Sequence, residues 1–197
     1  MIGLIMDGVV TWTSDVEYYS KICLELEEKC DDKFYKLFQA YSNLLEAFDI
    51  FKKIFKFRIL FRTFDTFFHG LLYVQVTLEV LNTDVMHFNK EEIRVFVIIT
   101  VLLTGKNVVS VAAFSLYCEK LYLSLIEADA VCSRLQKSQQ SNVEAKKLYK
   151  NVRRLNRAAF HKMTACRIFT IDGRLPFRFN SLVLEYIFVI LQFAFVT

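Results

Sequence analysis

Residues 95–118 constrain the fold of this chain more than any other part of it. This stretch, VFVIITVLLTGKNVVSVAAFSLYC, contains a single charged side chain, Lys106. A helix of that length extends about 36 Å, which exceeds the ~30 Å hydrocarbon core of a bilayer. One lysine costs only ~3 kcal/mol on insertion scales, and its long side chain can reach toward the interface. The stretch therefore predicts a transmembrane helix.

Residues 59–81 are also long enough to cross a bilayer, but they are amphipathic. At 100° per residue, five polar side chains fall within one arc of about 140°; they are Arg62, Asp65, His69, Gln75 and Glu79. Taken alone, the segment fits a membrane helix and a helix of a soluble bundle equally well. We expect a transmembrane hairpin over 59–118. Within it, we propose as a hypothesis that Lys106 meets Asp65 or a group near His69.

Residues 182–197 form a third apolar stretch, in which only Glu185 and Gln192 are strongly polar. As a helix this stretch extends about 24 Å, slightly less than the hydrocarbon core, and a locally thinned bilayer accommodates the difference. We therefore expect a C-terminal transmembrane helix over 179–197.

The composition and the residue spacing favour an all-α protein that has no catalytic or metal site. The 197 residues are 54% hydrophobic, with 20 Phe, 5 Gly and 1 Pro, as expected for long helices rather than a turn-rich β protein. The 5 Cys, at positions 23, 30, 118, 132 and 166, include no C-x-x-C pair, so we expect reduced, unpaired thiols. No phosphate-binding glycine loop occurs and the 3 His are scattered. We expect no enzyme activity, no metal and no cofactor.

The N-terminal part of the chain has a helical pattern. Between residues 15 and 58, large apolar side chains recur at steps of three and four, with Lys, Asp and Glu between them. Ser14 and Asp15 are suited to the start of a helix, and no Pro or Gly follows before Gly70. We predict a cytosolic amphipathic helix over 1–58, which can continue unbroken from near residue 15 to residue 81.

The distribution of charge predicts the orientation. Residues 119–178 contain 13 Lys or Arg against 5 Asp or Glu, whereas the loop expected at 82–94 has 2 basic residues. By the positive-inside rule, 119–178 and the N-terminus lie in the cytosol, and the C-terminus lies outside. A further loop is expected at 137–142. The chain is therefore predicted to cross the membrane three times.

Residues 146–162 carry 7 Lys or Arg, interleaved with Tyr149 and Phe160. Such a stretch can bind nucleic acid or anionic lipid. Because the neighbouring spans require positive charge on their cytosolic side, we interpret 119–178 as a cytosolic, basic helical anchor region. We expect no nucleic-acid partner.

The C-terminal stretch resembles a known family. Glu185-Tyr186, five apolar residues and Gln192-Phe193 resemble the C-terminal signature of insect gustatory receptors, which is Thr-Tyr, five hydrophobic residues and Gln-Phe. The upstream run Phe169-Thr170-Ile171-Asp172 with Leu175 is similar to the segment that precedes this signature. One position departs, since Glu185 stands where the family usually has Thr.

The resemblance implies a ligand-gated cation channel subunit of the plasma membrane that detects a small-molecule tastant and assembles as a homo- or hetero-tetramer within membrane lipid. Its last helix is expected to be split, with a cytosolic half at 145–171 and a pore half at 182–197, divided near Asp172-Gly173 and Pro176. Residues 15–81 and 93–136 would correspond to the fifth and sixth helices with their cytosolic extensions. Since the family has seven helices, we expect the chain to represent the C-terminal half.

The resemblance also implies roles for individual residues. Gln192 and Phe193 would face the pore near its outer gate, and Tyr186 would hold the last helix in place. Asp65, His69 and Lys106 are further candidates for pocket or packing contacts within the membrane.

Two other functions stay open. The chain can be a soluble helical interaction protein whose apolar segments all form core, and extraction of membranes with carbonate separates this from a membrane protein. It can also be a fragment of an insect odorant receptor, a related family that shares the split last helix; the run Tyr-x5-Gln-Phe favours the gustatory branch.

Overall fold

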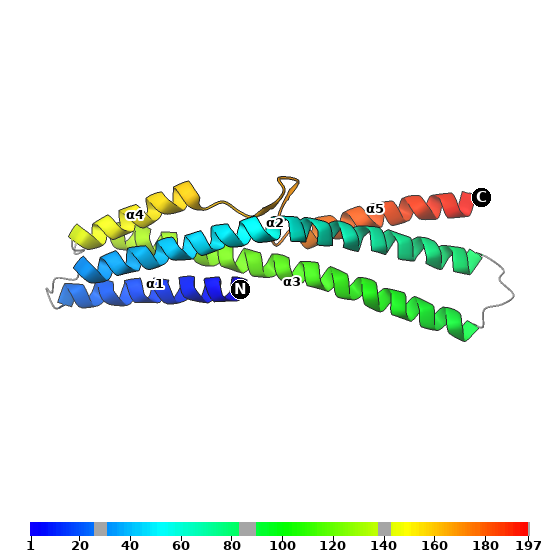
Figure 1. Ribbon diagram of the computed structural model, residues 1–197, viewed down its shortest axis with the longest axis horizontal. Helices are drawn as coiled ribbons and strands as arrows, with labels where there is room; N and C mark the ends of the chain where they lie inside the picture. The colour runs from blue at the N-terminus through cyan, green and yellow to red at the C-terminus, as the bar shows by residue number, and fades with distance from the viewer. Residues whose placement is uncertain (26–30, 83–89, 138–142, 197) are drawn as a thin grey trace. The chain divides into compact units, whose positions relative to one another are not determined.

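The computed structural model of the chain is mostly helical. It describes residues 1–25, 31–82, 90–137 and 143–196. These residues form five α-helices and one pair of short strands (Figure 1): α1 (Ile2–Glu25), α2 (Asp31–Asn82), α3 (Lys90–Lys137), α4 (Val143–Ala159), β1 (Thr164–Ala165), β2 (Phe169–Thr170) and α5 (Leu175–Val196). The expected helical class is confirmed.

The chain divides into two compact units. The first consists of Met1–Phe55 and Tyr117–Met163, and the second of Lys56–Leu116 and Thr164–Thr197. The long helices α2 and α3 therefore each contribute one part to the first unit and one part to the second.

The first unit is a bundle of α1, α4 and the adjoining parts of α2 and α3. Apolar residues recur on α1 at three- and four-residue steps, which gives the helix one apolar face, and this face is buried at Ile5, Val9, Trp12 and Val16. The indole Nε1 of Trp12 donates a hydrogen bond of 2.7 Å to the carbonyl oxygen of Leu37 on α2. The ring of Trp12 also lies 4.4 Å from that of Tyr41. These contacts hold α1 against α2.

A buried hydrogen bond joins α2 to α4 in the same bundle. The hydroxyl of Tyr41 donates to Oδ1 of Asn156 at 2.6 Å, and both side chains are buried. Burial raises the pKa of the Tyr41 phenol above its ordinary value, because a phenolate at this position would lose its hydration. Tyr41 is therefore a neutral hydrogen-bond donor at physiological pH.

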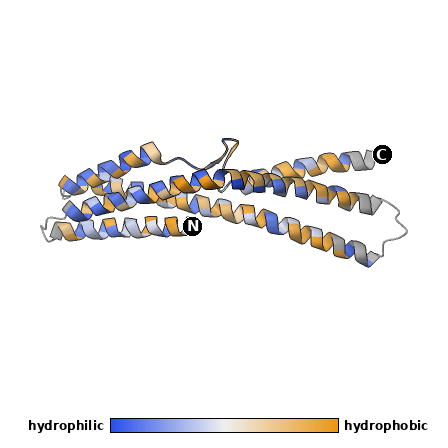
Figure 2. Cartoon of the chain, in the orientation of Figure 1, coloured by the Kyte–Doolittle hydropathy of each residue, from blue (hydrophilic) through white to orange (hydrophobic). Residues whose placement is uncertain are grey.

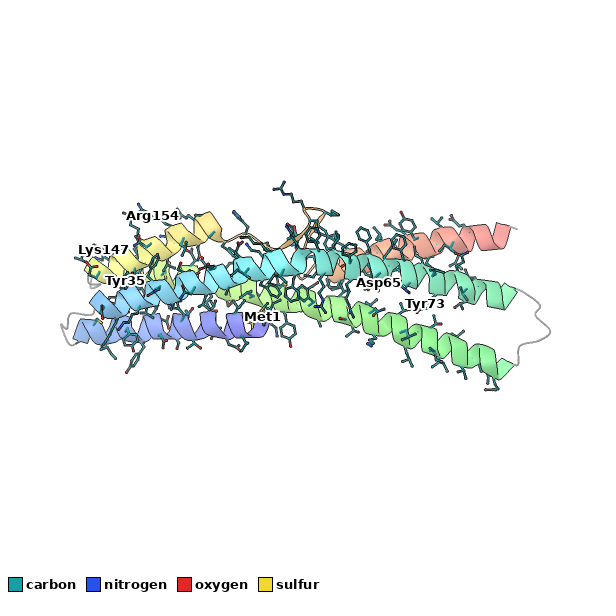
Figure 3. All side chains as sticks on the ribbon, viewed as in Figure 1. Met1, Tyr35, Asp65, Tyr73, Lys147 and Arg154 are labelled. Carbon is teal, nitrogen blue, oxygen red and sulfur yellow. The ribbon has the colours of Figure 1, made fainter. Side chains whose placement is uncertain are left out.

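The helix α4 is strongly amphipathic. It buries Ala145, Leu148, Tyr149, Val152 and Asn156 in the bundle. Its basic residues Lys147 and Arg154 are exposed and point away from the bundle (Figure 3). Lys150 and Arg157 are exposed as well, whereas Arg153 is half-buried beside Asp129. Most of the basic residues predicted as part of a helical anchor region thus lie on the solvated face of a packed helix.

The predicted single helix from residue 15 to residue 81 is wrong. Nζ of Lys33 lies 5.5 Å from the centre of the Tyr19 ring, whereas fourteen residues along one helix would separate them by about 21 Å. The first helix also begins at Ile2 rather than near Ser14. The absence of Pro and Gly permits a long helix without requiring one. The apolar face of α1 is buried only because the chain returns along α2.

Two of the predicted loops fall largely outside the described residues. The helix α3 begins at Lys90, so the last part of the loop predicted at 82–94 is helical. Residues 83–89 of that loop, and residues 138–142 of the loop predicted at 137–142, lie outside the part of the chain that the structure describes.

The second unit combines the remaining parts of α2 and α3 with the β1–β2 hairpin and α5. The helix α2 contacts both of its helical neighbours. Nη2 of Arg62 lies 3.4 Å from Oγ of Ser110 on α3. The ring of Phe67 packs edge-on against the rings of Phe179 and Tyr186 on α5. α2 therefore connects the other two helices of this unit.

The β1–β2 hairpin is absent from the sequence-based prediction. Thr164 pairs with Thr170, Ala165 pairs with Phe169, and the amide of Ile168 donates to the carbonyl of Ala165 at 2.9 Å. The two residues at the tip, Cys166 and Arg167, have φ values of 49° and 65°, as in a type I′ turn. Glycine and asparagine favour such positions, so Cys and Arg provided no turn signal.

The helix α5 begins directly after the hairpin. Oδ1 of Asp172 accepts a hydrogen bond of 3.1 Å from the backbone amide of Arg174, and the amide of Leu175 donates to the carbonyl of Asp172. Pro176 lies in the first turn of α5, where a helix leaves its amide groups unpaired in any case. The predicted helix breakers therefore include one residue, Pro176, that belongs to the helix.

The cysteines are not all reduced. Cys23 is disulfide-bonded. Cys118, Cys132 and Cys166 are free thiols. The expectation of unpaired thiols throughout is therefore wrong, because pairing depends on the distance between Cα atoms in the fold and not on a recognised spacing.

Candidate membrane-spanning region and pore helix

Two helices in the described part of the chain are long and apolar enough to cross a membrane. They are α3, over Val97–Lys137, and α5, over Leu175–Gln192 (Figure 2). In each, only 11% of an apolar 18-residue window is buried within the structure. A core helix of a soluble protein buries most of its apolar residues, and neither window does so.

Large apolar side chains are exposed over several turns of both helices. On α3 they include Val95, Ile98, Ile99, Val101, Leu102 and Val109, and on α5 they include Phe177, Leu184, Phe188 and Val189. Contiguous exposed apolar surface of this kind marks a contact with a membrane or with another protein.

The third predicted span, within α2, does not meet the same criterion of length and composition over its described residues. Its polar arc lowers its mean hydropathy, and Arg62, Asp65 and His69 are exposed. The side of α2 that packs within the unit instead presents Thr63, Thr66 and Gly70, which are buried. Two helices in the described part of the chain thus have the length and composition needed to cross a membrane, and the three spans themselves stay a prediction.

Tyr186 lies where α5 meets α2. Its ring centre is 5.3 Å from that of Phe67, with the ring planes at 86°, and Phe67 is in turn 6.5 Å from Phe179 at 72°. Edge-to-face pairs of this kind contribute ~0.5–1.5 kcal/mol beyond the area they bury. A side chain that holds the last helix in place needs a contact of this sort, although the role itself stays a prediction.

A cavity of about 370 Å³ adjoins this aromatic contact. Phe67, Phe179 and Tyr186 line it together with Phe169 of β2, and Arg178 contributes a basic side chain. Phe169, which belongs to the run Phe169-Thr170-Ile171-Asp172 upstream of the C-terminal signature, therefore lines the same cavity as Tyr186.

The two predicted gate residues are near the end of α5. Gln192 is exposed on this helix. Phe193 also belongs to α5, but its side chain lies outside those that the structure describes. Their role at a gate is therefore a prediction that the single chain leaves open.

Asp65 and His69 are brought together. Nδ1 of His69 lies 3.1 Å from Oδ1 of Asp65 and 2.9 Å from the carbonyl oxygen of the same residue. The two residues are one turn apart on α2, and both are exposed. Exposed pairs at this spacing contribute only ~0.3–0.5 kcal/mol, so the pair does not decide the stability of the unit.

Lys106 does not meet Asp65. The contact between Arg62 and Ser110 sets the antiparallel register of α2 and α3, and it places Asp65 level with residue 107 along the helix axes. Lys106 is thus at the expected height, yet it is exposed, and no ion pair joins it to Asp65 among residues 31–82 and 90–137. Height along a helix does not determine the direction in which a side chain points.

The sequence reasoning missed Phe67 and Phe179, the two partners of the Tyr186 contact. Phe67 lies two residues after Asp65, which at 100° per residue puts it on the apolar side of α2, opposite the polar arc. This position on the apolar side was the sequence feature from which a packing role for Phe67 could have been predicted. The neighbouring Phe64 and Phe68 are exposed, and composition alone did not distinguish them from Phe67.

Comparison of the chain with protein-family models and with curated proteins finds no match. The composition of α3 and α5, the exposure of their apolar side chains and the packing of Tyr186 are therefore the observations from which a function is argued.

Proposed function

We propose that this chain is the C-terminal part of an insect gustatory receptor. In this proposal it is a plasma-membrane subunit of a ligand-gated cation channel that responds to a small-molecule tastant. The observation that supports it most directly is the division between α4 and α5. A basic, amphipathic helix ends at Ala159, and an apolar helix with the run Tyr186-x5-Gln192-Phe193 begins at Leu175.

The surfaces of α4 and α5 support different environments for the two helices. α4 exposes basic residues such as Lys147 and Arg154, which are costly to place in hydrocarbon. α5 exposes Leu184, Phe188 and Val189, which lose nothing in lipid and are costly to leave in water. A cytosolic α4 and a membrane-embedded α5 satisfy both, and this is the split last helix that the resemblance implies.

The polar arc of α2 supports assembly with further helices. Arg62, Asp65 and His69 are exposed within the second unit. If this part of α2 spans the membrane as the third helix, these groups face other protein or water rather than lipid. A tetrameric channel provides such surroundings.

The proposed gate lies at the outer end of α5. Four copies of Phe193 around an axis would form an apolar constriction, and constrictions of this kind close a pore by dewetting. Gln192 would present a polar group beside it, and Tyr186, about 10 Å away along the helix, would fix the helix against α2 through Phe67.

Cation currents test the channel proposal. The chain is expressed in cells and recorded in the whole-cell configuration, and Phe193→Ala is compared with the wild type. We expect the variant to raise the leak current, because alanine cannot close the constriction. Phe188→Ala is the matched control, since Phe188 is on the same helix and 64% exposed. Equal currents for the wild type and Phe193→Ala would count against the gate.

Membrane extraction separates this proposal from the soluble alternative. We expect the chain to stay with membranes through a carbonate wash, and an epitope tag after Thr197 to be stained on intact cells. A chain released by the wash would favour a soluble helical interaction protein. A tag stained only after permeabilisation would overturn the proposed orientation.

A further inference from the structure

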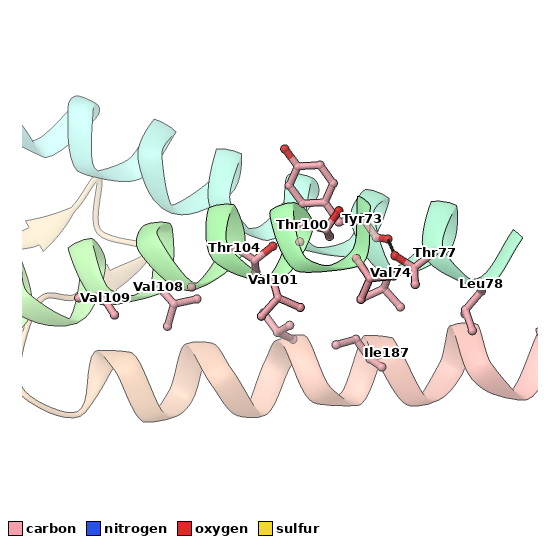
Figure 4. Close-up of a pocket in the computed structure, with 14 residues that line it drawn as sticks. Tyr73, Val74, Thr77, Leu78, Thr100, Val101, Thr104, Val108, Val109 and Ile187 are labelled. Carbon is pink, nitrogen blue, oxygen red and sulfur yellow. Dashed lines mark hydrogen bonds between the residues drawn. The ribbon is translucent and has the colours of Figure 1, made fainter. Parts of the chain in front are cut away.

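A slot of about 560 Å³ lies between α2, α3 and α5 of the second unit (Figure 4). α3 lines it from Val97 to Val109, α2 lines it from Gly70 to Leu78, and α5 contributes Val183 and Ile187. This volume is within the range of ~300–1,000 Å³ that small-molecule sites occupy. None of the three predicted polar residues, Asp65, His69 and Lys106, lines it.

The slot is long and narrow. Twelve residue steps from Val97 to Val109 correspond to about 18 Å along α3. A volume of about 560 Å³ spread over that length leaves a mean cross-section of roughly 30 Å². Such a space admits one extended chain more readily than a compact ring system.

The lining of the slot is uncharged. Its described side chains are mainly valine and leucine or isoleucine, with Tyr73 and three threonines as the polar members. The hydroxyl of Thr77 already donates a hydrogen bond of 2.7 Å to the carbonyl of Tyr73 (Figure 4). No acidic or basic side chain lines the slot within the described residues, so a charged ligand would lose its hydration without compensation.

Two glycines keep the slot open. A Cβ atom added at Gly70 or at Gly105 would meet nothing within 4 Å, although glycine within a helix costs up to ~1 kcal/mol relative to alanine. Gly105 therefore does not mark a close contact between helices. Both glycines instead border empty space in the slot.

We propose that this slot binds one extended, uncharged hydrocarbon chain, namely an acyl chain of a bilayer lipid. The membrane location of the second unit is taken from the proposed function, whereas the shape and chemistry of the slot are independent of it. The bound chain would lie against Val183 and Ile187, on the face of the proposed pore helix that α2 and α3 share. Lipid composition would thus act directly on the packing of α5.

Photolabelling of the full chain tests this proposal. The chain is reconstituted in phosphatidylcholine bilayers that contain a phosphatidylcholine with a diazirine on its acyl chain, and adducts are mapped by mass spectrometry. We expect adducts to be concentrated on slot residues of α3, such as Val101 and Thr104, relative to Ile98 and Leu102, which are outside the slot on the same helix. The double variant Gly70→Leu/Gly105→Leu fills the slot and should reduce labelling of Thr104 about tenfold while leaving Leu102 unchanged.

Gly3→Leu is the matched control, because a Cβ at Gly3 also meets nothing within 4 Å and Gly3 belongs to the first unit. It should leave all labelling unchanged. Equal labelling of Thr104 and Leu102 in the wild type, or labelling of Thr104 that persists in the filled variant, would overturn the slot as a lipid site. Displacement of the lipid label by dilute 1-octanol would instead assign the slot to a free aliphatic ligand. The labelling is done on a chain that resists the carbonate wash. Failure of the lipid site is therefore distinguishable from failure of the proposed function.

Discussion

The ring of Tyr186 on α5 meets the ring of Phe67 on α2 edge-on, with the centres 5.3 Å apart and the planes at 86°. We expect Tyr186→Ala and Phe67→Ala each to lower the stability of the second unit, and the double variant to lose less than the sum of the two. The coupling should be ~0.5–1.5 kcal/mol, as for other edge-to-face pairs. Thermal unfolding in detergent, followed by circular dichroism, provides the four values of the cycle.

Phe188→Ala replaces Tyr186→Ala in the control cycle. Phe188 is two residues further along α5 and is 64% exposed, so it should show no coupling to Phe67. If both cycles gave the same coupling, the Tyr186 contact would not be specific and its expected role in holding α5 would lose its support.

A second prediction concerns the partner of Asp65. Because Nδ1 of His69 lies 3.1 Å from its carboxylate, we expect a double-mutant cycle of Asp65→Asn and His69→Gln to show a weak coupling of ~0.3–0.5 kcal/mol. The cycle of Asp65→Asn with Lys106→Gln should show none. Coupling between Asp65 and Lys106 that exceeds the coupling to His69 would mean that the pairing differs in the membrane.

A third prediction uses the buried phenol of Tyr41. Its pKa in the folded chain is raised by burial, so the unfolded chain releases this proton at a lower pH than the folded chain. The stabilising contribution is therefore fully present below the ordinary pKa of tyrosine and is lost as the pH rises through and above it. We expect the urea concentration at which half of the first unit is unfolded to decrease as the pH is raised from 9 to 11.

Tyr41→Phe should have two opposite effects. At pH 7 it should cost ~1–3 kcal/mol, because Oδ1 of the buried Asn156 loses its donor. At alkaline pH it should reduce the loss of stability, since the phenol is gone. Tyr35→Phe is the control on the same helix, because Tyr35 is 67% exposed. An unchanged pH profile for Tyr41→Phe would rule out Tyr41 as the titrating group.

A fourth prediction concerns the turn between β1 and β2. Cys166 and Arg167 have positive φ values, a conformation that costs a residue other than glycine or asparagine ~1 kcal/mol. Replacing both with the pair favoured in type I′ turns, Cys166→Asn and Arg167→Gly, should stabilise the second unit by ~1–2 kcal/mol. Ile168→Gly, outside the two positive-φ positions, should not stabilise it. Destabilisation by the Asn-Gly pair would show that the side chains of Cys166 or Arg167 matter more than the backbone.

Individual helices show which features of the fold the local sequence pattern predicts. The apolar character of α3 was evident from the sequence, because a run of 24 residues with one charge is apolar whatever packs against it. The end of α1 was not, because its apolar face fits equally well on a long helix and on a short one that folds back. Arg62, Asp65, His69 and Gln75 of the polar arc of α2 are exposed, as rotation by 100° per residue grouped them, and the side chain of Glu79 lies outside those that the structure describes. The neighbours of α2 were not predicted, because the arc gives no information about which helix packs on the opposite side.

The amino-acid sequence by itself determined the helical class and the two helices that are long and apolar enough to cross a membrane. These properties depend on composition and on spacing within one segment. Only the tertiary structure decided that Phe67 meets Tyr186, that Asp65 pairs with His69 and not with Lys106, and that two glycines border an empty slot. Such contacts depend on the register and rotation of helices that are distant in the chain, and a shift of one residue turns a side chain by 100°.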